Sequence, residues 1–264
     1  MKKILTLAII ALTVGAAAFA QDGTVTRRFK VGNFDKLEVS VFNVEVRIGQ
    51  PTGDVEVTVS EKYADNVDIE VSGRTLNIGF DGIAIKNNYV AKAVVTAPVL
   101  CGIEGEAAAA ISLSGPIRTD RVEIDLSSAA SLTAPAIIAS ESVSIDMSSA
   151  ASANITKIET PRLESETASA SKLTIGTLSA ENTEFDASSA SSVTINGGKT
   201  VKAEFDASSS AKINASALLA ATGSADASSG ASIRCNIAKP KYIDRSSGAS
   251  IKNISQKNAP IGAK

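Results

Sequence analysis

An eight-residue motif recurs along the second half of this chain. Each copy begins with an acidic residue, continues with small residues and usually ends on an aliphatic one, as in Asp186–Val193 and Asp226–Ile233. The acidic residues of seven copies are Asp125, Asp146, Glu166, Asp186, Asp206, Asp226 and Asp244, at separations of 21, 20, 20, 20, 20 and 18 residues. A degenerate copy, Glu106–Leu113, is expected to open the series. A nearly fixed period of this length predicts a solenoid.

Aligning the copies on their acidic residue places apolar residues in four columns. In one copy these are Phe185, Ala187, Val193 and Ile195. They form two pairs with a spacing of two, separated by alanine and serine, which is typical of two short strands flanking a bend. Stacking the coils in register would put like residues on like.

A helical solenoid is the alternative interpretation of the alanine-rich stretches. Alanine is the best helix former, but serine competes for backbone hydrogen bonds and favours turns. No copy shows apolar residues at the three- and four-residue spacings of a helix face. Because parallel strands prefer right-handed connections, we predict an all-β chain, a right-handed parallel β-helix with about 20 residues per coil.

The region 21–104 has a different pattern. Leu37–Val41, Val44–Ile48 and Val55–Val59 alternate apolar and polar residues, which predicts strands with one buried face. The first coil of a solenoid exposes unpaired backbone that must be covered. We therefore predict that residues 21–104 form a β-rich N-terminal cap leading into repeats over 105–254, followed by a C-terminal tail, 255–264.

The first twenty residues resemble a secretory signal peptide. Lys2 and Lys3 precede an apolar stretch, Ile4–Val14, and Ala18–Ala20 supplies a small-residue cleavage site. We expect cleavage after Ala20 and export to the periplasm, the outer-membrane surface or the medium. The remaining sequence contains no apolar run of membrane-spanning length, so no transmembrane segment is expected in the mature chain.

Composition excludes several functions. The chain has no histidine, no tryptophan and 4% aromatic residues, so a histidine-based catalytic triad, a histidine metal site and a tryptophan sugar platform are absent. The formal net charge is −2, with no basic patch in the sequence that would favour nucleic acid. We therefore predict a non-enzymatic protein without a cofactor.

The enzyme alternative is a polysaccharide lyase, a class that also uses β-helices. Such an enzyme would combine carboxylates with a basic residue. Basic residues occur at outward positions of the repeat, but the sequence does not group them with an unusual set of acids. These candidates are Lys172, Lys212, Arg234 and Lys252.

The acidic column has two interpretations. Carboxylates about 4.8 Å apart repel by about 0.9 kcal/mol in water and by about 3.5 kcal/mol at an effective dielectric constant of 20. A divalent cation such as calcium would offset this repulsion, with Asp186, Asp206 and Asp226 as candidate ligands. Alternatively, the carboxylates accept hydrogen bonds from backbone N–H groups or from serines of the following turn. We favour the structural alternative and predict no metal, because no calcium-binding spacing is present.

A serine lies three residues after the acid in all seven copies. A catalytic serine needs a nearby base and is needed only once, so we predict a structural ladder that closes the bend. Its members are Ser128, Ser149, Ser169, Ser189, Ser209, Ser229 and Ser247.

The two cysteines, Cys101 and Cys235, are six to seven repeats apart. At about 4.8 Å per rung they would be on the order of 30 Å apart, whereas a disulfide needs Cα atoms within about 7 Å. We expect no internal disulfide and two small buried hydrophobic residues.

Five segments, in order, give the chain a family resemblance. Asn33–Val39, Val44–Val46, Leu76–Ile78, Val99–Ile103 and Ser246–Ile251 together resemble the head GIN domain family, whose members are described as autotransporter adhesins. The resemblance extends over about 29–254. It implies an exported β-helix on the Gram-negative envelope with an adhesive role, and it supplies no catalytic residues.

The sequence thus predicts a secreted structural or adhesin-like protein of the cell envelope. Its partner would be a polysaccharide or a protein surface, not nucleic acid, and the sequence leaves open a homo-oligomer.

Overall fold

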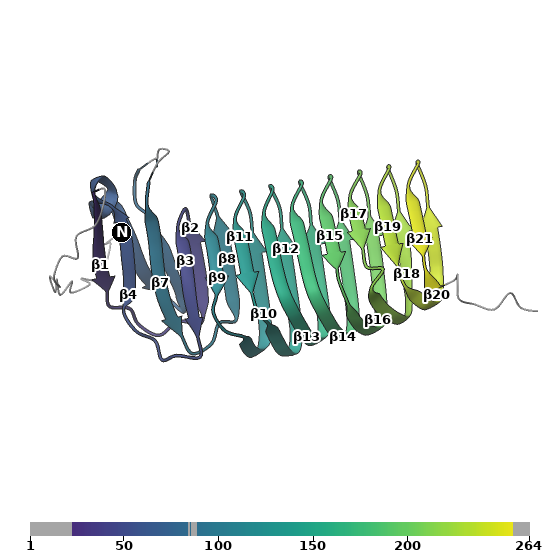
Figure 1. Ribbon diagram of the computed structural model, residues 1–264, viewed down its shortest axis with the longest axis horizontal. Coiled ribbons are helices and arrows are strands. Elements are labelled where there is room, and N and C mark those ends of the chain that lie inside the picture. The colour runs from purple at the N-terminus through teal and green to yellow at the C-terminus, as the bar shows by residue number, and fades with distance from the viewer. Residues whose placement is uncertain (1–22, 84, 86–88, 256–264) are drawn as a thin grey trace, which may run out of the picture.

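The computed structural model describes residues 23–83, 85 and 89–255 and shows a β-solenoid (Figure 1). About eight turns of roughly 20 residues each stack from one end to the other, which confirms the predicted fold class. Among the described residues the only helix is a short 3-10 segment, η1 (Glu61–Asn66). The predicted signal peptide, 1–20, and most of the predicted tail lie outside the described residues.

One side of every coil adds a strand to a long sheet, whose outward surface we call the carboxylate face. Its two strands at the N-terminal end, β5 and β6, are antiparallel, and each later strand is parallel to its neighbour. In spatial order the strands are β5 (Val67–Ser72), β6 (Thr75–Phe80), β2 (Lys36–Ser40), β8 (Gly102–Glu106), β10 (Ile117–Leu126), β12 (Ile137–Met147), β13 (Ser152–Thr167), β14 (Lys172–Ala187), β16 (Gly198–Ala207), β18 (Leu218–Ala227) and β20 (Ile237–Arg245).

The opposite side of every coil builds a second sheet. Here the starts of the long strands β13 and β14 take part, because these strands continue around the coil. In spatial order the other strands are β1 (Thr24–Phe29), β4 (Val55–Ser60), β7 (Ala91–Ala97), β3 (Asn43–Ile48), β9 (Ala110–Leu113), β11 (Ser131–Ala134), β15 (Ser192–Ile195), β17 (Lys212–Asn214), β19 (Ser232–Cys235) and β21 (Ser250–Asn253).

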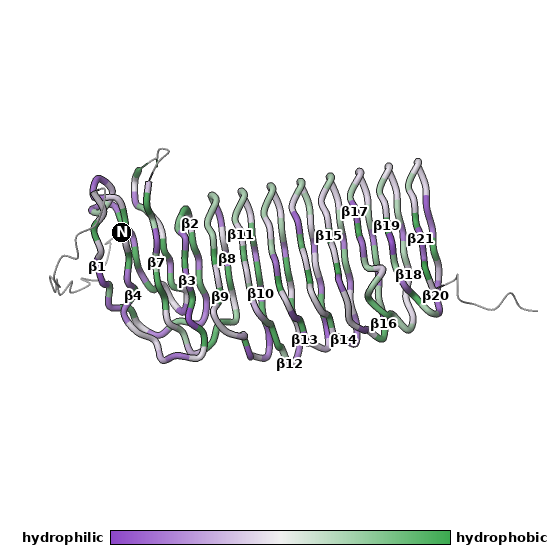
Figure 2. The backbone as a smooth tube through the Cα atoms, viewed as in Figure 1, coloured by the Kyte–Doolittle hydropathy of each residue, from purple (hydrophilic) through white to green (hydrophobic). Residues whose placement is uncertain are grey.

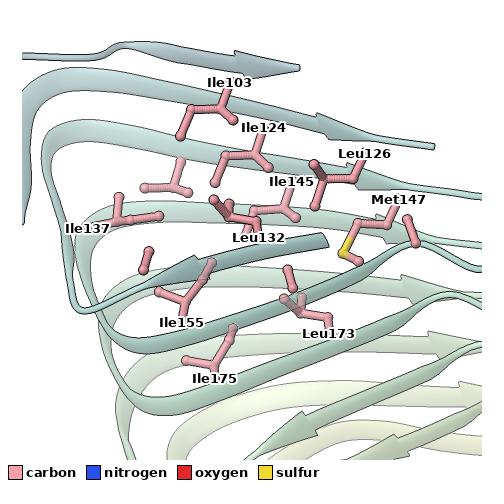
Figure 3. Close-up of a cluster of buried hydrophobic side chains, with 14 of the residues drawn as sticks. Ile103, Ile124, Leu126, Leu132, Ile137, Ile145, Met147, Ile155, Leu173 and Ile175 are labelled. Atoms are coloured by element: carbon pink, nitrogen blue, oxygen red, sulfur yellow. The ribbon is translucent and has the colours of Figure 1, made fainter. Parts of the chain in front are cut away.

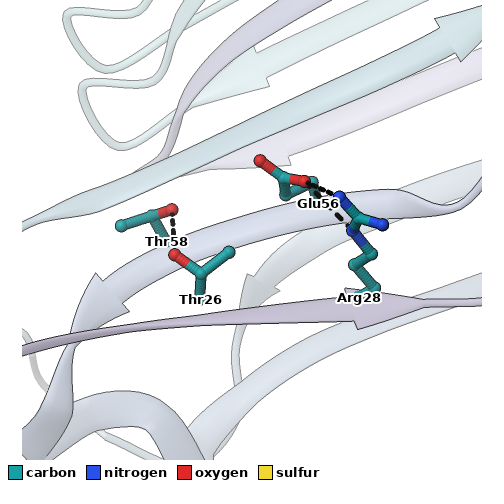
Figure 4. Close-up of polar contacts among 4 residues, drawn as sticks. All are labelled: Thr26, Arg28, Glu56 and Thr58. Atoms are coloured by element: carbon teal, nitrogen blue, oxygen red, sulfur yellow. Dashed lines mark hydrogen bonds and ion pairs between the residues drawn. The ribbon is translucent and has the colours of Figure 1, made fainter. Parts of the chain in front are cut away.

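The N-terminal strands lie over the first rung of the stack. The outermost strands, β1 and β5, run antiparallel to their neighbours β4 and β6. Arg28 holds Glu56 at 2.9 Å and the Thr26 hydroxyl lies 2.9 Å from that of Thr58, which ties β1 to β4 across the sheet (Figure 4). The order of strands at this end differs from their order in the chain. In the first sheet β2 lies between β6 and β8, and in the second sheet β3 lies between β7 and β9.

The core lies between the two sheets and is built from ladders of like side chains. Ile103, Ile124 and Ile145 follow one another on successive rungs (Figure 3). Further along the same column Phe185 stacks on Phe205, with ring centroids 5.8 Å apart. Green and purple segments alternate along many of the strands (Figure 2), as burial does along β3 and β4, which is the pattern expected for strands with one buried face.

Each coil turns from one sheet to the other through a tight bend, and these bends form the row of points at the top of Figure 1. In the bend Ser127–Ala130 the two central residues have φ of 50° and 64°, and the Ala130 N–H donates to the Ser127 carbonyl at 2.9 Å. Two successive left-handed residues define a type I′ turn. The left-handed backbone of these non-glycine residues is unfavourable. A hydrogen bond between rungs offsets part of this cost, because the Ala129 N–H donates to the carbonyl of Ser149 on the next rung at 2.8 Å.

The first copy of the motif differs from its predicted alignment. Glu104, and not Glu106, lies opposite Asp125. Glu106 instead precedes Ala107 and Ala108, whose φ of 47° and 63° mark the bend. The prediction that the series opens at Glu106 is therefore wrong by two residues, because a run of alanines hides the position of the turn.

The last coil ends on a side-chain cap. The Asn253 amide oxygen accepts from the Ile237 N–H, and the amide nitrogen donates to the Ile237 carbonyl, both at 2.9 Å. This pair satisfies backbone groups that the next coil would otherwise bond. Edge groups left unpaired would favour aggregation.

Two buried serines differ in whether their hydroxyl groups are hydrogen-bonded, which predicts opposite effects of alanine substitution on stability. The Ser165 hydroxyl is buried and has no hydrogen-bond partner among the described residues. The Ser171 hydroxyl, in contrast, donates to the Met147 and Ala168 carbonyls at 3.1 and 2.6 Å. An unsatisfied buried hydroxyl costs free energy, while a satisfied one contributes. We expect Ser165→Ala to raise the free energy of unfolding by about 1 kcal/mol and Ser171→Ala to lower it by about 1 kcal/mol. Chemical denaturation of both variants measures this, and equal losses would contradict it.

Candidate functional site

The outward surface of the first sheet carries an unbroken column of acids. The strand register places one carboxylate on each of nine successive rungs. These residues, which we call the carboxylate row, are Glu38, Glu104, Asp125, Asp146, Glu166, Asp186, Asp206, Asp226 and Asp244. The predicted stacking of Asp186, Asp206 and Asp226 is confirmed.

The carboxylate row has few protein partners. Asp244 accepts a hydrogen bond from the Arg245 backbone N–H at 2.8 Å. Within the described part of the chain, no other carboxylate of the row accepts a hydrogen bond or forms an ion pair. The serine donors that the sequence suggested, such as Ser188, lie beside the row without bonding to it.

Burial and mutual repulsion raise the pKa values of four members of the row. The pKa of Asp186 rises to about 6, chiefly through burial and then through the charges of Asp206 and Glu184. The pKa values of Glu104, Asp146 and Asp206 are raised for the same two reasons. The row is thus an electrostatic cost that stacking in register imposes on the fold.

A shallow groove of about 410 Å³ follows the row beside Glu166, Asp186, Asp206 and Asp226. Alanine and serine residues of the bends form its other side. Among the described residues there is no group of three or more His, Cys, Asp or Glu residues placed to hold one metal ion. The metal candidates Asp186, Asp206 and Asp226 instead present one carboxylate per rung.

The predicted serine ladder lies on the bends and is exposed. All seven serines have φ between 49° and 52°. These serines join neighbouring bends through their backbone: the carbonyl of Ser149, for example, accepts a hydrogen bond from the Ala129 N–H on the neighbouring rung. Sequence reasoning missed this left-handed conformation. Gly230 and Gly248, which replace alanine in the last two bends, were the available signal.

Over residues 110–252 the outward surface of the second sheet has a different chemistry, and we call this part the hydroxyl face. Its two outward columns over residues 110–252 hold Ser, Thr, Asn, Lys and Arg with one alanine, and no acid or aromatic residue. One column is Ala110, Ser131, Ser152, Lys172, Ser192, Lys212, Ser232 and Ser250. The other is Ser112, Thr133, Asn154, Thr174, Thr194, Asn214, Arg234 and Lys252.

The residues considered for a lyase site are not brought together. Lys172, Lys212, Arg234 and Lys252 lie on the hydroxyl face, and the carboxylate row lies on the opposite sheet with the core between them. A general base and acid must both reach the substrate within hydrogen-bond distance. Because of this separation, the four bases and the carboxylate row cannot act together on one substrate bond.

A third, short side of the coils forms another groove, of about 610 Å³. Arg118, Asp120 and Glu159 line it. The Ser140 hydroxyl donates to Asp120 at 2.6 Å, and Lys157 lies 2.8 Å from Glu159 and lowers the pKa of that carboxyl. A carboxyl with a lowered pKa is a poor general acid at neutral pH, which disfavours that role for Glu159.

Both cysteines are free thiols. Cys235 is buried in β19, where burial raises its pKa to about 11. Burial first, and then the charge of Asp35, raises the pKa of Cys101. Asp35 is itself held by Arg74 at 2.5 Å, which lowers its own pKa. Thiols with raised pKa values carry little thiolate and are weak nucleophiles.

The described residues thus define a β-solenoid with two flat faces of different chemistry. No helix in this part of the chain is long and apolar enough to cross a membrane. The chain belongs to the family described as "Putative auto-transporter adhesin, head GIN domain", whose model matches residues 33–204 and 143–256. This confirms the resemblance found in the sequence.

Solved structures share the fold. A "putative adhesin" from Parabacteroides distasonis is 16% identical with a TM-score of 0.72, covering 87% of this chain and 97% of its own. One from Parabacteroides merdae is 13% identical with a TM-score of 0.65, covering 88% and 96%. A "Putative lipid binding protein" from Parabacteroides distasonis is 19% identical with a TM-score of 0.62, covering 88% and 97%. No curated protein matches the chain significantly.

The raised pKa of Asp186 predicts how stability depends on pH. The pKa of Asp186 is about 6 in the folded chain, against a reference value of 3.8. Because the folded chain binds this proton more tightly than the unfolded chain, protonation of Asp186 stabilises the fold. The stabilisation is fully present below about pH 3.8 and is lost as the pH rises through about 6. We expect the melting temperature to increase between pH 7.5 and pH 5, and Asp186→Asn to increase it at pH 7.5 and weaken its pH dependence. After allowance for solvent screening the effect is about 1 kcal/mol, or about 2–4 °C.

Glu181→Gln, which removes an exposed acid outside the row, is the matched control and should leave the melting temperature nearly unchanged. Thermal melts of the three proteins at both pH values measure the effect. A lower melting temperature for Asp186→Asn at pH 7.5 would show that this carboxylate stabilises the fold.

Proposed function

We propose that this protein is an exported, non-catalytic, adhesin-like module that binds a polymer or a protein surface along its flat faces. The observation that carries the proposal is the repetition of the same outward groups on successive rungs of both sheets. A repeated, rigid surface suits a repeated ligand, because many weak contacts then act together. Family membership supports the adhesive role.

The non-catalytic part of the proposal rests on how the charged groups are distributed. The acids of the carboxylate row and the free bases of the hydroxyl face lie on opposite sheets. The thiols of Cys101 and Cys235 have raised pKa values. None of these arrangements supplies a nucleophile next to a base.

Export is proposed from the sequence of residues 1–20, with its two lysines, apolar stretch and small-residue cleavage site. The periplasm, the outer-membrane surface and the medium are all consistent with an adhesin-like role. Cell fractionation followed by N-terminal sequencing tests this. A mature chain that begins at Gln21 is the expected result, and retention of Met1 in a cytoplasmic fraction would contradict it.

Binding and turnover can be tested together. Residues 21–264, folded, are applied to arrays of polysaccharides and envelope or matrix proteins, and each ligand retained is then incubated with the protein and sized. We expect retention on at least one ligand with no change in its chain length, and no retention of the heat-unfolded protein. Shortening of any polymer would instead favour the lyase alternative, and failure to retain any ligand would contradict an adhesive role.

A further inference from the structure

We propose that the hydroxyl face binds an acidic polysaccharide, laid along the solenoid axis across successive rungs. This inference rests on the proposed function and names the ligand class and the face that receives it. It is carried by the free positive charges, the hydroxyl and amide columns, and the absence of acidic, aromatic and large apolar groups on this face.

The positive charges of the hydroxyl face are not neutralised by the protein. Its four exposed bases, Lys172, Lys212, Arg234 and Lys252, form no ion pair with any described residue. No carboxylate stands in either outward column. Since like charges with no counterpart are unfavourable, a surface of this kind favours a negatively charged ligand.

Bases on the opposite sheet behave differently. Arg121 pairs with Glu141 at 2.5 Å, and Lys202 pairs with Glu204 at 2.7 Å. Arg162 likewise lies 3.3 Å from Glu164. The chain therefore neutralises these three bases of the carboxylate face, whereas the four bases of the hydroxyl face have no ion-pair partner among the described residues.

The neutral groups of the hydroxyl face suit a sugar chain. Ser, Thr and Asn side chains both donate and accept hydrogen bonds, and they recur at each rung, about 4.8 Å apart. Thr133, Asn154, Thr174, Thr194 and Asn214 form a continuous series in one column. At the N-terminal end of the face lies a hollow of about 350 Å³, which residues of β9 and β11 form together with β3 and β7, including Glu45 and Lys92.

Other anionic partners fit this surface less well. Single-stranded nucleic acid binds through aromatic stacking platforms, and the two columns contain none. Membrane-surface binding requires apolar groups that enter the bilayer, and stable protein interfaces usually have an aromatic or apolar centre. The exposed large apolar residues of the described chain, Val201, Leu219 and Tyr242, all lie outside the hydroxyl face.

The test compares polygalacturonate with its methyl-esterified form, which has the same backbone but lacks the charge. Binding of folded residues 21–264 is measured by affinity electrophoresis and calorimetry at low and high ionic strength. We expect the acidic polymer to bind at least about tenfold more tightly than the esterified one, with an affinity that falls as salt increases. The polymer should keep its length.

Two sets of variants locate the binding. Replacing the four bases of the hydroxyl face, Lys172, Lys212, Arg234 and Lys252, with glutamine should weaken binding at least about tenfold. The matched control replaces four exposed bases elsewhere, Arg118, Lys199, Lys239 and Lys241, with glutamine, which changes the net charge equally and should leave binding nearly unchanged. Circular dichroism confirms that both variants are folded.

A further variant removes the hydroxyls and keeps the charge. Thr133→Val, Thr174→Val and Thr194→Val preserve shape and strand preference, so the fold should persist while binding weakens several-fold.

The outcomes separate this inference from the proposed function. Equal binding by the hydroxyl-face and control variants, equal binding of the esterified polymer, or equal retention of polyadenylate or anionic vesicles would overturn the inference. So would no binding of polygalacturonate. In each case retention on another ligand without turnover would leave the adhesin-like function standing, whereas depolymerisation would overturn that function.

Discussion

Parallel backbone pairing in strict register is the interaction on which this molecule depends. Once Asp186 lies opposite Asp206 and Phe185 opposite Phe205, every column of the repeat becomes a row of identical environments. Inside the coil this favours the fold, because aliphatic and aromatic side chains stack and leave water together. Outside the coil the same register places like charges about 4.8 Å apart. Core stability and surface repulsion therefore have a single cause.

The bends show how stacking offsets local cost. A left-handed backbone is unfavourable for serine and alanine, yet the bends adopt it on every rung from Ala107 to Gly248. Each bend is closed by its own hydrogen bond and joined to its neighbour by another, as between Ala129 and Ser149.

The sequence predicted the parts of the fold that repeat and missed the parts that do not. The acidic, phenylalanine and aliphatic columns follow from the period alone. The placement of β2 and β3 ahead of β8 does not, because these strands pair across an insertion without any repeat signal. The bend after Glu106 could not be located from the sequence, because residues 107–110 are all alanine. The sequence predicted outward positions for Lys172, Lys212 and Arg234. It did not show that these bases share one face on the sheet opposite the acids, which the strand pairing of the structure establishes.

This division between the faces follows from the position of each column within the coil. The acid lies before the bend and the columns of Lys172 and Thr174 lie after it, so the two chemistries are separated by the core in every rung. Outward residues contribute little to the core. The carboxylate row costs stability and the hydroxyl face leaves its bases unpaired, and neither pattern is required by the inward ladders. Surface columns that the core does not demand are therefore where ligand recognition in this solenoid has to be sought.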